Sequence, residues 1–183
     1  MKLELKPHPD TRQGVASHVA VEVLRPGPRA VRLRYRILAD AGALHLPSRA
    51  PSVRTDELWR HTCLEAFIRA PDSEAYYELN FSPSTQWAAY RLAGYRKGMS
   101  QAGIPAPSIE VLSDAHSLEL SATADLAALT DLPADRPWRL GLSAVIEAAD
   151  GEVAYWALAH PPGRPDFHHA DCFAGELVSP GAA

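Results

Sequence analysis

The sequence lacks several features on which common functions depend. No apolar run is long enough to span a bilayer, and the opening MKLELKPHPD contains no apolar segment typical of a signal peptide. Since the only cysteines are Cys63 and Cys172, and nothing in the sequence requires them to pair, we expect a cytoplasmic protein with reduced thiols. The net charge of −4 gives no support to a general role in binding nucleic acid or anionic membranes.

Catalytic and cofactor-binding motifs are also missing. There is no CxxC or HExxH pattern for zinc, no GxSxG pattern for a serine nucleophile, and no glycine-rich loop for phosphate or nucleotides. His61 and Cys63 are close enough in sequence to consider a Cys–His nucleophile, but no helix N-terminus is predicted there to stabilise a thiolate. A buried structural cysteine is therefore the favoured interpretation, and an enzyme built on Cys63 stays an alternative.

The chain does have the length and apolar content of a folded domain. It contains 183 residues, of which 46% are hydrophobic and 22% charged, as is ordinary for a globular protein. Chains of this size bury about 70% of the surface that they expose when unfolded. With no internal repeat and with prolines spread from Pro7 to Pro180, the sequence predicts one domain over residues 1–183.

Alternating apolar and polar residues predict many short strands. In AVRLRYRIL, residues 30–38, every second residue is apolar and arginines stand between them. HVAVEVL, residues 18–24, precedes it, and the turn RPGP at 25–28 would join the two as an antiparallel hairpin. Further strands are expected at residues 63–70, 75–82, 87–95, 108–112, 117–123, 138–148 and 152–159.

Helical signals are few. TDELWRH, residues 55–61, predicts one turn capped by Thr55 or Asp56, and TADLAAL, residues 123–129, predicts another. Residues 87–96 also fit a helical period, so a helix there is an alternative to the strand. The pattern as a whole predicts an all-β, single-domain β-sandwich, jelly-roll-like, with two antiparallel sheets and one or two short helical turns.

Polar side chains interrupt strands that otherwise look buried. Glu65 lies in CLEAFI, while Glu78 and Asn80 lie on one face of YYELNFS. An unpaired carboxylate on a buried face is unfavourable, so this face is either solvated or lines a polar pocket. The second interpretation predicts a concave sheet surface that binds a hydroxyl-rich small molecule. Flat aromatic faces for such a ligand could come from Trp59, Trp87, Tyr90 and Trp156.

The C-terminal segment WALAHPPGRPDFHHADCF concentrates histidines and aspartates. His168 and His169 would point in opposite directions on an extended chain, and prolines separate them from His160, so the spacing is not that of a typical metal site. The favoured interpretation is a proline-stiffened loop with Phe167 and Phe173 tucked into the end of the sandwich. A ligand-binding loop and a metal site stay open as alternatives.

Three blocks of sequence carry a family likeness: LWRHTCLEAFI, YYELNFSPSTQWAAYRLAGYRKGM and LGLSAVIEAADGEVAYWALAHPPGRPDFHH. Over residues 55–175 they resemble bacterial DOMON-like domains, which are similar to family 9 carbohydrate-binding modules. The resemblance implies a β-sandwich that binds a sugar or haem. In the sugar-binding modules a sugar lies between two tryptophans, for which Trp59 and Trp156 are the candidates here. In the haem-binding members a Met and a His hold the iron, and Met99 with one of the histidines would be the corresponding pair.

We therefore predict a non-catalytic domain that binds a small polar ligand, a sugar or sugar derivative, with a haem- or metal-binding β-sandwich protein as the alternative. The predicted ligand-binding residues are Trp59, His61, Glu65, Glu78, Asn80, Trp87, Glu147, Trp156, His160, His168 and His169. We expect no catalytic or metal-ligating residues, no cofactor other than haem in the alternative, and neither nucleic acid nor membrane as a partner. The sequence does not indicate an oligomeric state.

Overall fold

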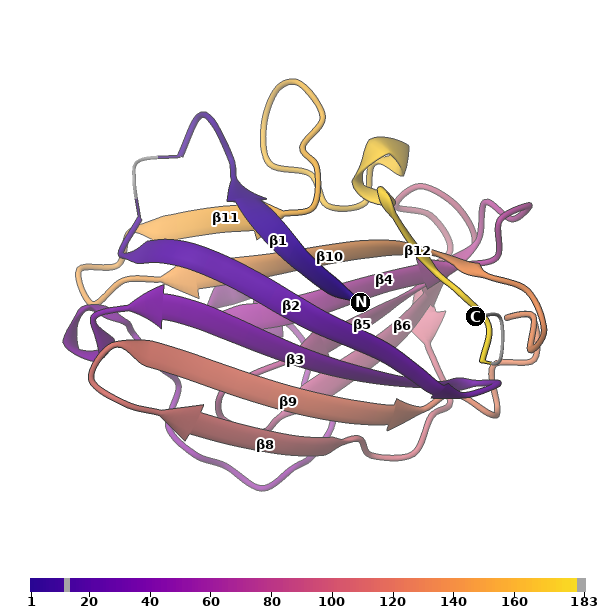
Figure 1. Ribbon diagram of the computed structural model, residues 1–183, viewed down its shortest axis with the longest axis horizontal. Helices are drawn as coiled ribbons and strands as arrows, with labels where there is room; N and C mark the ends of the chain where they lie inside the picture. The colour runs from indigo at the N-terminus through magenta and orange to yellow at the C-terminus, as the bar shows by residue number, and fades with distance from the viewer. Residues whose placement is uncertain (12–13, 181–183) are drawn as a thin grey trace.

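The structure is a computed structural model that describes residues 1–11 and 14–180, and most of its regular elements are strands (Figure 1). The strands are β1 (Lys2–Pro7), β2 (Ala16–Gly27), β3 (Ala30–Ala39), β4 (Cys63–Arg69), β5 (Tyr76–Phe81), β6 (Trp87–Leu92), β7 (Ser100–Gln101), β8 (Ser108–Ser113), β9 (Ser117–Asp125), β10 (Trp138–Glu147), β11 (Val153–Ala157) and β12 (Gly175–Leu177). Short 3-10 turns accompany them: η1 (Ala41–Ala43), η2 (Leu58–Arg60) and η3 (Ala170–Cys172). None of the helices in these described ranges is long and apolar enough to cross a membrane.

Two antiparallel layers form a β-sandwich, and β1 passes from one layer to the other (Figure 1). Sheet A has the strand order β1-β2-β3-β9-β8, and sheet B has the order β7-β6-β5-β4-β10-β11-β1. The first part of β1, through Leu5, pairs with β2, whereas Lys6 and Pro7 pair with β11. β12 adds a short pairing at the start of β10. The predicted all-β sandwich is confirmed.

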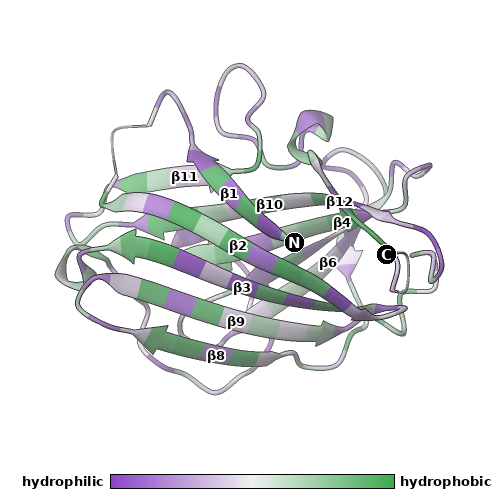
Figure 2. Ribbon diagram, in the orientation of Figure 1, coloured by the Kyte–Doolittle hydropathy of each residue, from purple (hydrophilic) through white to green (hydrophobic). Residues whose placement is uncertain are grey.

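The main core lies between the two sheets. The inward-facing residues of β3 are fully buried: Val31, Leu33, Tyr35 and Ile37. The arginines between them are exposed, and Figure 2 shows hydrophobic and hydrophilic residues alternating along β3. Across the core, the Tyr35 hydroxyl donates a hydrogen bond of 2.6 Å to the main-chain carbonyl of Glu65 in sheet B. The period-two pattern therefore identified both the strand and its buried face.

A second apolar cluster covers the outer face of sheet B. Phe67 of β4 contacts Phe173, with 6.3 Å between ring centroids, and Phe167 is buried in the same cluster. Gly141 of β10 permits this close covering, because a Cβ at that position would lie 3.1 Å from the carbonyl oxygen of Cys172. The two phenylalanines of the C-terminal segment are thus buried as expected, but against the outer face of sheet B.

Two of the expected local structures were wrong. There is no helical turn at 123–129, because β9 continues to Asp125, which still pairs with Ala30 of β3, and a hydrogen-bonded turn follows. The predicted RPGP turn at 25–28 begins too early, because β2 runs to Gly27 through an irregularity in its pairing after Leu24.

The helical turn within 55–61 exists as η2, but its cap differs from the prediction. Glu57 precedes it in a left-handed conformation with φ of 61°, and no side-chain hydrogen bond caps the turn. The helix considered for 87–96 was wrong, since β6 occupies Trp87–Leu92. Strands β1, β7 and β12 were not predicted.

Candidate functional site

A cavity of about 970 Å³ lies on the outer face of sheet B. Strands β4, β5, β6, β10 and β11 form its floor through Glu65, Glu78, Tyr90, Val145 and Tyr155. Its walls come from three stretches outside these strands, at 56–59, 96–101 and 164–168. The face on which the polar strand residues lie is therefore covered rather than openly solvated.

The floor carries two buried carboxylates. Glu65 is 3% exposed and Glu78 is 6% exposed. The Ser143 hydroxyl donates 2.9 Å to Glu65 Oε2, and Asn80 Nδ2 donates 2.8 Å to Glu78 Oε1. Antiparallel pairing brings these groups together, because Glu65 lies directly between Ser143 of β10 and Asn80 of β5. Asn80 Oδ1 is buried and has no hydrogen-bond partner within the described residues.

Burial changes the protonation of this pair. It raises the pKa of Glu65 to about 8; the charge of Glu78 adds to the rise, and the hydrogen bond from Ser143 opposes it. Burial also raises the pKa of Glu78, against the hydrogen bond from Asn80 and the charge of Arg96. At neutral pH the floor therefore holds a proton on Glu65, which can donate a hydrogen bond, beside carboxyl oxygens that can accept one.

The C-terminal segment places His168 over this floor. Its Nδ1 lies 2.8 Å from the Tyr76 hydroxyl, and its Nε2 lies 4.0 Å from Glu78 Oε2. Burial lowers the pKa of His168 to about 4, and the charge of Arg96 acts in the same direction. Arg96 is itself held by Asp166, with 2.8 Å between Nη2 and Oδ1. His168 is therefore a neutral group beside the carboxylates at physiological pH.

The stretch that includes η2 supplies an aromatic wall. The indole of Trp59 lines the cavity and is half exposed, with the guanidinium carbon of Arg60 5.4 Å from its ring centroid. Beside it, the Tyr90 hydroxyl donates 2.6 Å to Asp56 Oδ1. The cavity thus combines a flat apolar surface with carboxylates and a guanidinium group.

The structure brings together part of the predicted ligand-binding set. Trp59, Glu65, Glu78 and His168 line the cavity, and Asn80 adjoins it through its bond to Glu78.

Trp87 and Trp156 lie elsewhere, in the core between the sheets, each 5% exposed. On β11, adjacent side chains face opposite sides, so Tyr155 lines the cavity while Trp156 points into the core. Trp59 and Trp156 therefore do not face one another across the cavity. Trp87 packs instead beneath Arg54, whose guanidinium carbon lies 4.5 Å from the ring centroid.

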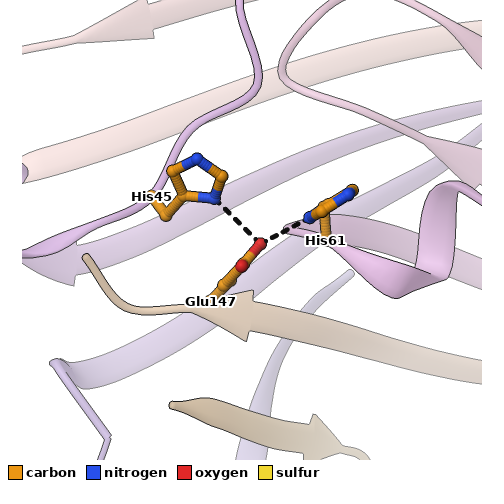
Figure 3. A group of neighbouring side chains, drawn as sticks. All are labelled: His45, His61 and Glu147. Atoms are coloured by element: carbon orange, nitrogen blue, oxygen red, sulfur yellow. Dashed lines mark hydrogen bonds and ion pairs between the residues drawn. The ribbon is translucent and has the colours of Figure 1, made fainter. Parts of the chain in front are cut away.

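His61 and Glu147 meet outside the cavity lining, together with His45 (Figure 3). The Nδ1 atoms of His61 and His45 lie 2.7 Å and 3.0 Å from the same oxygen, Glu147 Oε2. Partial burial acts to raise the pKa of Glu147, but the hydrogen bonds from both histidines outweigh it and hold the pKa below its usual value. His45 was not among the predicted residues, because only the fold brings it beside Glu147.

His160 and His169 have local structural roles. His160 Nε2 lies 2.8 Å from the main-chain carbonyl oxygen of Lys6 in β1. His169 precedes η3, and its Nδ1 accepts a hydrogen bond from the backbone N–H of Asp171. Neither ring is part of the cavity lining.

Tyr90, expected from the sequence as an aromatic ring near the polar face, does line the cavity and lies directly across from Glu78 in the β5–β6 pairing. Sequence reasoning missed other residues of the lining. Arg96, Arg164 and Asp56 lie outside the strands that form the floor, and no periodic pattern marks them.

Cys63 is fully buried in the outer apolar cluster of sheet B. Burial raises the pKa of its thiol well above the usual value, and the charges of Glu65 and Glu78 raise it further. The nearby His61 is directed instead to Glu147. Cys63 is thus held as a thiol, without a base in hydrogen-bond contact.

No protein-family model matches the sequence, and no curated protein matches it. Solved structures do show the same fold. A protein from Bacteroides uniformis to which carbohydrate binding is ascribed superimposes with a TM-score of 0.64 at 14% identity, covering 98% of this chain and 86% of that one.

A family 9 carbohydrate-binding module from Caldicellulosiruptor kristjanssonii is also similar. Its complex with cellotriose gives a TM-score of 0.60 at 10% identity, covering 100% of this chain and 84% of that one. Its complex with glucose gives 0.55 at 10% identity, covering 98% and 86%. At such identities the likeness shows the shared fold. The similarity to family 9 modules therefore holds for the fold, while the DOMON-like assignment stays a prediction.

Proposed function

We propose that the cavity on the outer face of sheet B binds a small, neutral carbohydrate without changing it chemically. The observation that carries the proposal is the composition of this cavity, in which the half-exposed indole of Trp59 and the buried pair Glu65 and Glu78 line one space of about 970 Å³. That volume lies in the range of about 300–1,000 Å³ found for small-molecule sites.

The polar groups suit a ligand rich in hydroxyls. A hydroxyl both donates and accepts hydrogen bonds, and the floor offers a protonated carboxyl at Glu65 as a donor together with the carboxyl oxygens of Glu65 and Glu78 as acceptors. Arg96 adds fixed donors, because its ion pair with Asp166 holds the guanidinium in place at the cavity wall. Each of these groups is positioned before a ligand arrives, which reduces the ordering cost of binding.

The aromatic wall suits the apolar face of a sugar ring. An indole offers a large, rigid surface at low conformational cost, and Trp59 is the tryptophan that lines the cavity. The fold neighbours support the same ligand class, since two of the structures contain glucose or cellotriose.

The charges favour a neutral sugar over a sugar phosphate. Four acidic side chains line the cavity, Asp56, Glu57, Glu65 and Glu78, against the two arginines Arg96 and Arg164. A phosphate group would therefore meet more acidic than basic side chains, which disfavours its binding.

A ligand screen by thermal shift tests the proposal. The protein is heated with glucose, cellotriose, glucose 6-phosphate or haemin, and a neutral sugar at about 100 times its Kd should raise the midpoint by about 5–11 °C. A shift with haemin alone would favour the haem-binding alternative, for which Met99 and His168 both line the cavity. Release of new reducing ends from cellotriose would contradict the non-catalytic part of the proposal.

Matched variants then locate the site. Glu78→Gln should weaken sugar binding by about 2–10-fold, which corresponds to the loss of one ordinary hydrogen bond. Glu110→Gln, at an exposed position on β8 of the other sheet, should leave the affinity unchanged. Equal affinities for both variants and the wild type would place the ligand elsewhere.

A further inference from the structure

Three segments distant in sequence meet beside the end of β10. His45 follows η1, His61 follows η2, and Glu147 is the last residue of β10. Figure 3 shows both imidazole rings directed at the same carboxylate oxygen, from either side. Within the described ranges these side chains form the group whose metal-binding atoms converge, all lying within 4.8 Å of one another.

Hydrogen bonds that do not involve the imidazoles or the carboxylate also hold the three segments together. The Thr62 hydroxyl is buried; it donates 3.0 Å to the carbonyl of His45 and accepts 3.1 Å from the N–H of Glu147. The N–H of His45 also donates 2.9 Å to the carbonyl of Glu147. The three segments are therefore fixed to one another before any ligand binds. Little further conformational entropy is lost when an ion binds.

The donor atoms suit a late first-row transition-metal ion. Two imidazole nitrogens and one carboxylate oxygen are ligands that Zn²⁺ accepts, with a fourth position left for water. At bond lengths of about 2.0–2.1 Å, tetrahedral ligand atoms lie about 3.3 Å apart. The present contacts of 2.7 Å and 3.0 Å to Glu147 Oε2 would therefore need to open by about 0.6 Å and about 0.3 Å. The rings of His45 and His61 can make this movement, because their side chains are 53% and 55% exposed.

Besides this small ring movement, metal binding requires a change of tautomer. Without a metal, an N–H at Nδ1 of each histidine donates to Glu147 Oε2. With the proton on Nε2, Nδ1 is free to bind the ion, and Nε2 donates to water. Both rings are already exposed to solvent, so this change of tautomer requires no buried group to become exposed.

We propose that His45, His61 and Glu147 bind a divalent transition-metal ion, with Zn²⁺ as the ion to test. The site lies outside the cavity lining and does not depend on the proposed carbohydrate binding. His61 directly follows η2, which carries Trp59, so a bound ion would also tie that turn to the end of β10.

Calorimetry with Zn²⁺ tests the proposal. The full chain is stripped with a chelator, dialysed and titrated with zinc chloride; we expect one ion per chain and an unfolding midpoint that rises by about 5–11 °C at 100 times the Kd. His45→Gln, His61→Gln and Glu147→Gln should each lose more affinity than the roughly 10–100-fold that removal of an outer-shell partner costs. His116→Gln, at another exposed histidine, should bind zinc like the wild type.

A second measurement protects the test against misfolded variants. Co²⁺ bound by two imidazoles and a carboxylate should give visible absorption that added Zn²⁺ abolishes. This absorption should be missing in His45→Gln, a variant chosen because the His45 ring is exposed and its removal leaves no cavity in the core. Midpoints measured in chelator identify any variant that is itself destabilised. The proposal is overturned if the wild type binds no zinc at about 1 mM, or if His45→Gln and His61→Gln bind it as well as His116→Gln.

Discussion

Replacing Glu65 by Gln should remove a pH-dependent penalty on folding. Glu65 lies 3% exposed on the cavity floor, and burial with the neighbouring charge of Glu78 raises its pKa from 4.5 to about 8. Between these pH values the unfolded chain has released the proton while the folded protein retains it. The stabilising contribution of protonated Glu65 is therefore complete below pH 4.5 and is lost as the pH rises toward 8.

The size of this effect follows from the shift. Each pH unit costs about 1.4 kcal/mol, so the whole interval amounts to about 5 kcal/mol as an order of magnitude. His168 acts in the opposite direction, because its pKa is lowered from 6.5 to about 4, and it adds stability as the pH rises through that range. Above pH 6.5 the Glu65 contribution is no longer offset by His168, and between pH 6.5 and 8 it amounts to about 2 kcal/mol.

Urea unfolding at pH 6.5 and pH 8 measures the difference. The wild type should lose about 2 kcal/mol of unfolding free energy between the two. Glu65→Gln should lose clearly less, because its amide has no proton to release and still accepts the hydrogen bond from Ser143. Glu110→Gln, exposed on β8, should behave like the wild type. Parallel losses in the wild type and Glu65→Gln would refute the assignment of a raised pKa to this carboxyl.

Further predictions concern the covering of sheet B. His168→Gln should lose less stability than the wild type as the pH falls from 6.5 toward 4 in urea unfolding, because the buried neutral imidazole must otherwise take up a proton; identical profiles would contradict this. Gly141→Ala should lower the unfolding free energy by about 1–3 kcal/mol, since the new Cβ would lie 3.1 Å from the carbonyl oxygen of Cys172; an unchanged urea midpoint would show that the C-terminal segment can move away. A thiol reagent should label neither Cys63 nor Cys172 until the protein unfolds, because both are buried. Labelling of Cys63 in the native protein would instead support the alternative in which Cys63 is a reactive nucleophile.

The strands were predictable because their signal is local. Alternation along β3 and β5 identified the strands, and it also placed Glu78 and Asn80 on one face. The error at 123–129 arose where local composition competed with pairing, because the ladder to β3 extends the strand to Asp125. Short strands such as β7 and β12 have too few residues to show a period.

The candidate site was only partly predictable, because its walls depend on chain segments that fold back over sheet B. Alternation shows that Tyr155 and Trp156 point to opposite faces of β11, but it does not show which face lies toward the core. The sequence therefore could not identify Tyr155, rather than Trp156, as the cavity residue. Arg96 reaches the site from a turn after β6, and His45 meets Glu147 only through tertiary contacts. Such contacts leave no mark on sequence periodicity.

The most direct test of the proposed function is a titration of the intrinsic fluorescence with glucose and cellotriose. Trp59 is 50% exposed at the cavity, whereas Trp87, Trp138 and Trp156 are at most 5% exposed, so a bound sugar should change the emission of one indole. We predict a saturable change in the wild type that is retained in Leu112→Ala, an exposed change on the other sheet, and lost in Trp59→Phe. Emission that stays constant with either sugar, or a change that persists in Trp59→Phe, would contradict carbohydrate binding at this cavity.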